Sequence, residues 1–361
     1  MLRFECDYSE GAHPRILQRL LETNNDQTPG YGEDDYCDTA RKIIRLACGD
    51  ENMDVHFLVG GTQANATVIA SALRPYQGVI CAETGHIASH ETGAIEATGH
   101  KVLPIPSENG KISALQVKAL VEAHWNDSTH EHMPQPAMVY ISQPTETGLV
   151  YTKRELEELR RICTRLGLYL FADGARLGYA LASDSCDLYL SDMARLCDVF
   201  YIGGTKVGAM FGEAVCITNK TLKTDFRYNM KQRGAMLAKG RFLGLQFDVL
   251  LRDGLYLQIS KKAVSQAMRI KEAFQSSGCH FLYDSPTNQQ FPIVNSMVLT
   301  ELSKNYSFAL WQKMSGDFTA IRFVTSWATA DSAVDSLVND IKRICRLYGE
   351  KTPSWSVELP E

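Results

Sequence analysis

The fold is decided by two neighbouring stretches, LYLFADGARLG (168–178) and DVFYIGGTKVGAMFGEAVCI (198–217). Each begins as a short apolar run and reaches a polar cluster where the chain leaves that run. This pattern predicts two buried strands, which end near Asp173 and Gly203. Open α/β sheets place their ligands at the carboxyl ends of parallel strands. We therefore expect a ligand site at this edge, built around Asp173 and Lys206.

The two residue types suit pyridoxal phosphate chemistry. A lysine can form a Schiff base, and an aspartate can pair with a protonated ring nitrogen. A carboxylate in a covered site needs a positive partner, and glycines beside Lys206 let the backbone approach a cofactor closely. Taken singly, Asp173 could cap a turn and Lys206 could be a solvated loop lysine. Their joint placement after two buried strands favours the pyridoxal phosphate interpretation.

Composition limits the class of protein. The 361 residues are enough for two domains, and 37 basic against 42 acidic residues give a formal charge of −5 without long runs of one sign, so we expect no nucleic-acid or membrane partner. Ten scattered cysteines without a CxxC pair, and an amino terminus without an apolar core, predict a soluble cytoplasmic protein. We expect no metal site, because His124, His130 and His132 share a polar loop.

Apolar runs alternate with helical patterns through the first two thirds of the chain. Further strands are expected at 55–61, 78–83, 101–106 and 137–142. Helices are expected at 14–22, 36–47, 62–73, 91–97, 113–123 and 152–167, the last with a capping box and a terminal glycine. This alternation predicts an α/β fold with a mostly parallel seven-stranded sheet and helices on both faces.

The pattern changes after about residue 250. A long helix (253–277), strands near 279–284 and 289–299, a helix near 301–314, a strand at 320–327 and a last helix at 330–348 predict a smaller α+β domain. The expected organisation is an N-terminal arm (1–30), a large cofactor-binding domain (31–250) and a small C-terminal domain (251–361).

Two further strand ends carry candidate site residues. Gly61 and Thr62 lie between a strand and a helix, where backbone amides can bind an anion such as a phosphate, although an ordinary turn is as frequent. His86 follows the next strand and could stack on a flat ring or act as a base, although a lone histidine is more often structural. His90 and Glu91 are near enough in sequence to join it.

Basic residues supply anion-binding candidates. Arg322, in an apolar strand, needs an anionic partner if it faces inward, and either a substrate carboxylate or a structural ion pair would serve. The segment 231–241 contains Arg233, Lys239 and Arg241, which could reach a phosphate or form a solvated basic face.

Together these motifs resemble those of the low-specificity L-threonine aldolase and β-eliminating lyase family, within the fold-type I pyridoxal-phosphate enzymes. The resemblance covers nearly the whole chain. The matching motifs are GGTQAN (60–65), TGH followed by HETG (84–93), FADGAR (171–176), GGTKVGA (203–209), YGED (31–34) and IRFVTSW (321–327). Thr205 stands where the family usually has serine, and His90 where many threonine aldolases have an aromatic residue.

The resemblance implies a role for each candidate. Lys206 would hold pyridoxal 5'-phosphate covalently as a Schiff base, Asp173 would keep the ring nitrogen protonated, and His86, with His90, would take the β-hydroxyl proton. The implied cofactor-binding residues are Gly61, Thr62, His86, Asp173, Arg176, Thr205, Lys206, Arg233 and Lys239. The implied substrate-binding residues are Arg176, Arg322, Tyr31 and His90.

The implied reaction is retro-aldol cleavage of a β-hydroxy-α-amino acid, such as L-threonine or L-allo-threonine, to glycine and an aldehyde. A β-eliminating lyase that acts on another small amino acid is the alternative, and a non-catalytic relative is a third. The family also implies a homodimer or homotetramer with shared active sites, in which Tyr31 projects into the neighbouring subunit's site.

Overall fold

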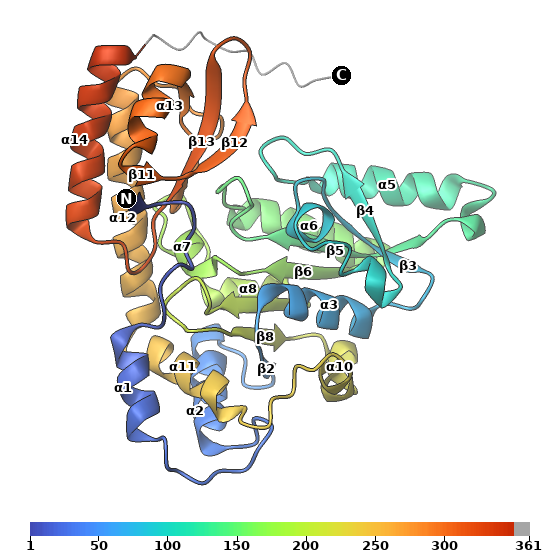
Figure 1. Ribbon diagram of the computed structural model, residues 1–361. Coiled ribbons are helices and arrows are strands. Elements are labelled where there is room, and N and C mark those ends of the chain that lie inside the picture. Colours follow the sequence, from blue (N-terminus) through green and yellow to red (C-terminus); the bar gives the residue numbers. More distant parts are fainter. Residues whose placement is uncertain (350–361) are drawn as a thin grey trace.

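One seven-stranded sheet organises the large domain, in the order β2-β8-β7-β6-β5-β3-β4 (Figure 1). The computed structural model describes residues 1–349. The strands are β2 (Asp54–Leu58), β3 (Gln77–Ala82), β4 (Lys101–Ile105), β5 (Gln135–Ser142), β6 (Tyr169–Asp173), β7 (Val199–Gly203) and β8 (Glu213–Ile217). Neighbouring strands pair in parallel except where β8 takes part. The predicted mostly parallel sheet is confirmed.

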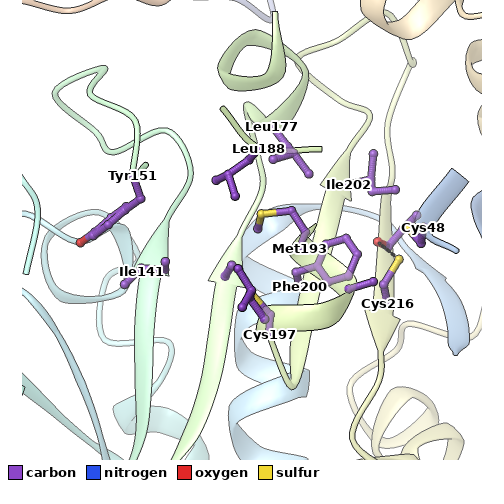
Figure 2. Close-up of a cluster of buried hydrophobic side chains, with 14 of the residues drawn as sticks. Cys48, Ile141, Tyr151, Leu177, Leu188, Met193, Cys197, Phe200, Ile202 and Cys216 are labelled. Atoms are coloured by element: carbon purple, nitrogen blue, oxygen red, sulfur yellow. Dashed lines mark hydrogen bonds between the residues drawn. The ribbon is translucent and has the colours of Figure 1, made fainter. Parts of the chain in front are cut away.

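Alternate residues of the strands are buried on opposite faces of the sheet. Leu170 and Ala172 of β6 join one apolar cluster, while Phe171 between them joins the other. The first cluster includes helices α2 (Asp35–Cys48), α5 (Ala114–Asn126), α6 (Lys153–Leu166), α7 (Leu177–Leu181), α8 (Leu190–Leu196) and α11 (Arg241–Arg252). The second includes α3 (Gly61–Ala72), α9 (Lys220–Lys223) and α10 (Phe226–Gln232). In Figure 2, Phe200, Ile202 and Cys216 of the strands gather with Met193 and Cys48 of the helices.

Several helix ends follow the expected local chemistry. Helix α1 (Pro14–Glu22) has proline at its first position, and α2 ends at Gly49, which adopts a left-handed φ of 65°. The capping box of Thr152 and Glu155 starts α6, as predicted.

The predicted helix at 91–97 is wrong. The chain instead forms one short turn, α4 (His86–Ser89), and later a 3-10 turn, η1 (Glu96–Thr98). Thr92 and Gly93 lie between them with φ values of 53° and 71°, which a right-handed helix cannot contain.

The small domain lies beyond α12 (Leu255–Ser276) and away from the large sheet (Figure 1). Its strands are β9 (Gln289–Gln290), β10 (Ile293–Asn295), β11 (Tyr306–Ser307), β12 (Ala309–Lys313) and β13 (Phe318–Val324), and its helices are α13 (Ser296–Ser303) and α14 (Asp331–Tyr348). The predicted helix at 301–314 is mostly wrong, because β12 pairs with β13 and this long-range pairing overrides local preference. The predicted strand at 279–284 forms only a bridge between Phe281 and Pro292.

The N-terminal arm connects the two domains. Strand β1 (Leu2–Arg3) pairs in parallel with β11, and Phe4 is buried in the small domain's core. Farther along, the His13 amide donates to the Gly208 carbonyl at 2.8 Å, just after Lys206. Within residues 1–349, no helix combines the length and the apolar character that crossing a membrane requires.

Candidate active site

A cavity of about 580 Å³ opens at the carboxyl edge of the large sheet, where the arm and the small domain close over it. It contains most of the site residues predicted from sequence: Gly61, Thr62, His86, His90, Asp173, Arg176, Thr205, Lys206 and Arg322. The carboxyl ends of four strands, β2, β3, β6 and β7, supply all of these except Arg322, because these strands end at the same edge of the sheet.

Asp173 ends β6 as a buried carboxylate with three hydrogen-bond donors. Its Oδ2 accepts from the Tyr140 hydroxyl at 2.6 Å and the Asn65 amide at 3.0 Å, and its Oδ1 accepts from the Ala175 backbone N–H at 2.9 Å. Burial alone would raise the pKa of Asp173, but the hydrogen bonds from Tyr140 and Ala175 and the nearby His86 lower it below its ordinary value. Asp173 is therefore a carboxylate at neutral pH and can pair with a protonated ring nitrogen.

Lys206 lies in the turn between β7 and β8. Burial, and then the charge of Arg176, lower the pKa of its amine. Within the described chain, no carboxylate lies within ion-pair distance of Lys206, and its Nζ lies 6.0 Å from the centre of the Tyr8 ring. A desolvated lysine with a lowered pKa has more of the free amine that attacks a carbonyl group.

Thr205 and Glu213 form the wall behind this lysine. The Thr205 hydroxyl donates to Glu213 Oε1 at 2.8 Å and accepts from the Gly212 amide at 3.0 Å. Glu213 reaches this edge because β8 is antiparallel, so that its first residue lies opposite Gly203 at the end of β7. Burial raises the pKa of Glu213 to about 8, which keeps this carboxyl largely protonated at neutral pH.

The amino terminus of α3 faces the cavity through Gly61 and Thr62. Its cap residue, Gly60, provides no side-chain hydrogen bond to the first turn. A Cβ atom at Gly61 would lie only 3.1 Å from the Tyr201 hydroxyl oxygen, so a glycine keeps this approach open. Uncapped amides at a helix amino terminus suit a phosphate group.

His86 is held by two glutamate side chains. Its Nδ1 lies 2.8 Å from Glu91 Oε1, and its backbone N–H donates to Glu146 Oε1 at 2.9 Å. Burial opposes the charged imidazole, but Glu91 and Asp173 raise the pKa of His86 above its ordinary value. The ring of His90 lies 5.8 Å from that of His86, and burial together with the charges of His86 and Arg322 lowers the pKa of His90.

The two predicted carboxylate-binding arginines have different surroundings. Arg176 donates to Asp7 through Nε at 2.7 Å and Nη2 at 3.0 Å. Arg322 donates to the Glu5 carbonyl at 3.1 Å and the Gln289 side chain at 3.3 Å, both uncharged acceptors, and lies over the Trp311 ring. Arg322 therefore lacks a carboxylate partner within residues 1–349, whereas Arg176 has one.

Three predicted site residues do not line the cavity. Tyr31 is about half exposed and lies beside Lys231, whose Nζ is 4.8 Å from its ring centre. Lys239 is exposed, and Arg233 is half-buried near Asn229. In a single chain these residues do not reach the cluster around Lys206.

Other residues of the cavity were not predicted: Tyr8, Ser142, Glu146, Tyr201, Glu213 and Trp311. Glu146 follows the carboxyl end of β5, so the rule that located Asp173 could also have found it. Glu213 begins an antiparallel strand, and Trp311 lies in the segment predicted as a helix, so neither carried a usable signal.

Comparisons with known proteins identify the family to which this chain is similar. A family described as beta-eliminating lyase matches residues 12–296. Low specificity L-threonine aldolases from Pseudomonas sp. (strain NCIMB 10558) and Pseudomonas aeruginosa are each 31% identical to the chain, covering 95% of it and 97% of each relative.

Solved structures show the same relationship. The threonine aldolase of Leishmania major has a TM-score of 0.93 and 43% identity, covering 96% of this chain and 100% of that one. A Thermus thermophilus aspartate aminotransferase double mutant has a TM-score of 0.70 at 14% identity, covering 95% of this chain and 91% of that one. This second similarity concerns the fold alone, which is the fold-type I arrangement expected from the sequence.

Proposed function

The chain belongs to the beta-eliminating lyase family, and from this premise we propose that it is a pyridoxal-phosphate-dependent aldolase. It cleaves β-hydroxy-α-amino acids of the L-threonine type to glycine and an aldehyde. The observation that carries the proposal is the arrangement of Lys206, Asp173 and the α3 amino terminus around one cavity.

The residues of the cavity fit the cofactor. Lys206 would bind it covalently, Asp173 would hold its ring nitrogen, and Gly61 and Thr62 would receive its phosphate. When bound, pyridoxal phosphate accepts the electron pair of a bond that breaks at the substrate Cα. The ionised state of Asp173 supports this assignment, because a carboxylate stabilises a protonated ring nitrogen.

Arg322 would anchor the substrate carboxylate, with Arg176 beside it. Two observations support Arg322: its hydrogen-bond acceptors are uncharged, and burial lowers the pKa of its guanidinium, so that an anion would relieve an unbalanced charge. Fixing the carboxylate orients the Cα–Cβ bond relative to the cofactor, and orientation is a large part of the rate gain in such reactions.

His86 and His90 would handle the β-hydroxyl proton. Glu91 engages Nδ1 of His86 and thereby fixes the orientation of its ring. His90 has a lowered pKa and is therefore neutral and able to accept a proton near pH 7. His86, the more basic imidazole, would stack on the cofactor ring and stabilise the negative charge that develops nearby.

Product identification tests the proposed reaction. The purified protein, loaded with pyridoxal phosphate, is incubated with L-threonine, L-allo-threonine, phenylserine or cysteine, with a Lys206→Ala variant as the control. Glycine and acetaldehyde from threonine would support aldol cleavage. Ammonia and a keto acid would support the β-eliminating alternative, and no product from any substrate would reject both.

We also propose a homodimer or homotetramer in which Tyr31, Arg233 and Lys239 complete a neighbouring subunit's site. None of the three lines the cavity of its own chain, which supports this proposal. Mixing Lys206→Ala with Tyr31→Ala subunits should restore activity, because one site in each hybrid has both native residues. A fully active monomer, or inactive hybrids despite demonstrated subunit exchange, would contradict shared sites.

A cytoplasmic location is proposed from the cysteines. All ten are free, and most are buried in the core, as expected of a chain that stays reduced. Fractionation of cells that express the natural protein would test this location.

A further inference from the structure

Asp7 in the N-terminal arm is fully buried, and its carboxylate accepts three hydrogen bonds from side chains. Its two carboxylate oxygens accept from Nε and Nη2 of Arg176 at 2.7 and 3.0 Å. Oδ2 also accepts from the side-chain amide of Asn288 at 3.0 Å. Planar, bidentate pairing of this kind fixes the orientation of a guanidinium as well as its position.

The arm around Asp7 contacts both domains at the cavity. On the small-domain side, the Val324 amide donates to the Phe4 carbonyl at 2.8 Å and Arg322 donates to the Glu5 carbonyl at 3.1 Å. On the large-domain side, Asp7 binds Arg176 and the His13 amide donates to Gly208. Ten residues therefore connect Arg322, Arg176 and the turn that carries Lys206.

Asn288 extends this connection. Its side-chain amide also donates to the Thr325 carbonyl at 2.9 Å, three residues beyond Arg322. Asp7 is thus the point at which Arg176 of the large domain and Asn288 of the small domain meet.

Charge gives Asp7 a second effect. Burial would raise the pKa of Asp7, but the charges of Arg176 and Lys206 lower it, so that it stays ionised. In turn the charge of Asp7 raises the pKa of Lys206, as does that of Asp173, against the effects of burial and Arg176.

We propose that Asp7 is a positioning residue that aligns Arg176 with Arg322 across the domain junction and balances the positive charge around Lys206. This rests on the proposed function. Asp7 occupies Nε and Nη2 of Arg176, and Nη1 has no hydrogen-bond partner within residues 1–349. Arg176 lines the cavity, and in this proposal its remaining edge receives the substrate carboxylate.

A structural ion pair without a role in the site is the competing explanation, and the chain contains a matched control for it. Asp198 is also buried, and it accepts from Arg160 at 2.6 Å and from the Asn219 amide at 2.8 Å. It precedes β7, at the edge of the sheet opposite the cavity. Asp7→Asn and Asp198→Asn therefore remove the same charge from similar surroundings, near the site and far from it.

Three kinds of measurement separate the explanations. The first is thermal stability, and the second is the KM and kcat for L-threonine together with the Kd for glycine. The third is the pH dependence with which an amine reagent labels Lys206 in cofactor-free protein. We expect both variants to lose stability. Only Asp7→Asn should raise the KM and the glycine Kd by about tenfold, equivalent to ~1.4 kcal/mol, with a smaller change in kcat. Only Asp7→Asn should also shift the labelling midpoint of Lys206 to lower pH.

A milder variant covers the case in which Asp7→Asn does not fold. Asn288→Ala keeps both charges but frees the small-domain side of the contact, and it should raise the KM without moving the Lys206 midpoint.

Equal KM values and equal labelling midpoints for Asp7→Asn and Asp198→Asn would overturn the proposal, as would an unchanged KM in Asn288→Ala. If wild-type protein forms no glycine from L-threonine, the proposed function fails instead. Glycine affinity and Lys206 labelling would still report on Asp7, since neither requires turnover.

Discussion

Two buried carboxyl groups line the same cavity, but one is ionised and the other is largely protonated at neutral pH. Asp173, at the end of β6, receives three hydrogen-bond donors and has a lowered pKa. Glu213, at the start of β8, receives the Thr205 hydroxyl and the Gly204 amide, and its pKa is raised to about 8. Both side chains are almost wholly out of solvent, so burial alone does not decide the charge. The hydrogen-bond donors and the charges around each carboxyl group decide it.

Because Asp173 is ionised and Glu213 is largely protonated, the two sides of the site differ in charge. The Asp173 side, with Tyr140 and Asn65, provides a fixed negative charge. The Glu213 side provides a largely protonated, hydrogen-bonded carboxyl behind Lys206, which adds little to the negative charge that Asp173 and Asp7 already supply.

The largest expected effect is that of Lys206→Ala. It should reduce turnover by about a thousandfold or more, because the proposed covalent link to the cofactor could not form. Borohydride reduction of the loaded wild-type protein, followed by peptide mapping, checks the assignment. A label on another lysine would show that Lys206 does not bind the cofactor, and the comparison of Asp173 with Glu213 around Lys206 would lose its basis.

Asp173→Asn should come next. The amide keeps the size of the side chain but not its charge, so the protein should still bind cofactor while kcat falls by about a hundredfold or more. Cofactor absorbance and turnover are measured on the same sample. Full activity at full occupancy would show that the charge of Asp173 is not needed, and the contrast with Glu213 would disappear.

Glu91→Gln should have an intermediate effect. Loss of the negative charge beside Nδ1 should lower the pKa of His86 and reduce kcat by roughly tenfold. Histidine NMR signals followed over pH in cofactor-free protein measure the first change. An unmoved His86 titration would mean that Asp173 alone raises its pKa.

Glu213→Gln should change activity least, by less than about threefold near neutral pH, because a neutral amide replaces a largely protonated carboxyl. Its main effect should be on stability. The folded protein holds the Glu213 proton up to a pH of about 8, whereas an unfolded chain releases it near pH ~4.3.

The stabilising contribution of protonated Glu213 is therefore complete at low pH and declines as pH rises from about 4 to about 8. The unfolding free energy of Glu213→Gln, relative to that of wild type, should therefore be lowest at low pH and should increase as the pH rises over that range. A constant difference across the range would show that Glu213 is ionised in the folded protein.

The central site was predictable because its residues obey a local rule. Asp173, Lys206 and His86 each follow a recognisable apolar strand, and the parallel sheet then brings them together without further information. Prediction was less successful where long-range pairing fixes the structure, as in β12, whose Trp311 reaches the cavity from a segment expected to be helical.

The sequence also did not predict which residues contact the predicted site residues. Arg176 was predicted to bind an anion, but its buried partner Asp7 lies 169 positions away in an arm with little local signal. Glu213 was hidden because it belongs to the antiparallel strand, to which the carboxyl-end rule does not apply.

The arm has a consequence for how the chain folds. Asp7 meets Asn288 across 281 positions, and Glu5 meets Arg322 across 317, so nearly the whole chain lies between the partners of these contacts. Closing so long a loop costs conformational entropy, and contacts between distant segments form slowly. The arm can therefore make these contacts only after the small domain has folded. Until then the large domain holds Lys206 and Asp173 in a site that lacks the residues of the arm and the small domain, so catalytic activity should arise late in folding.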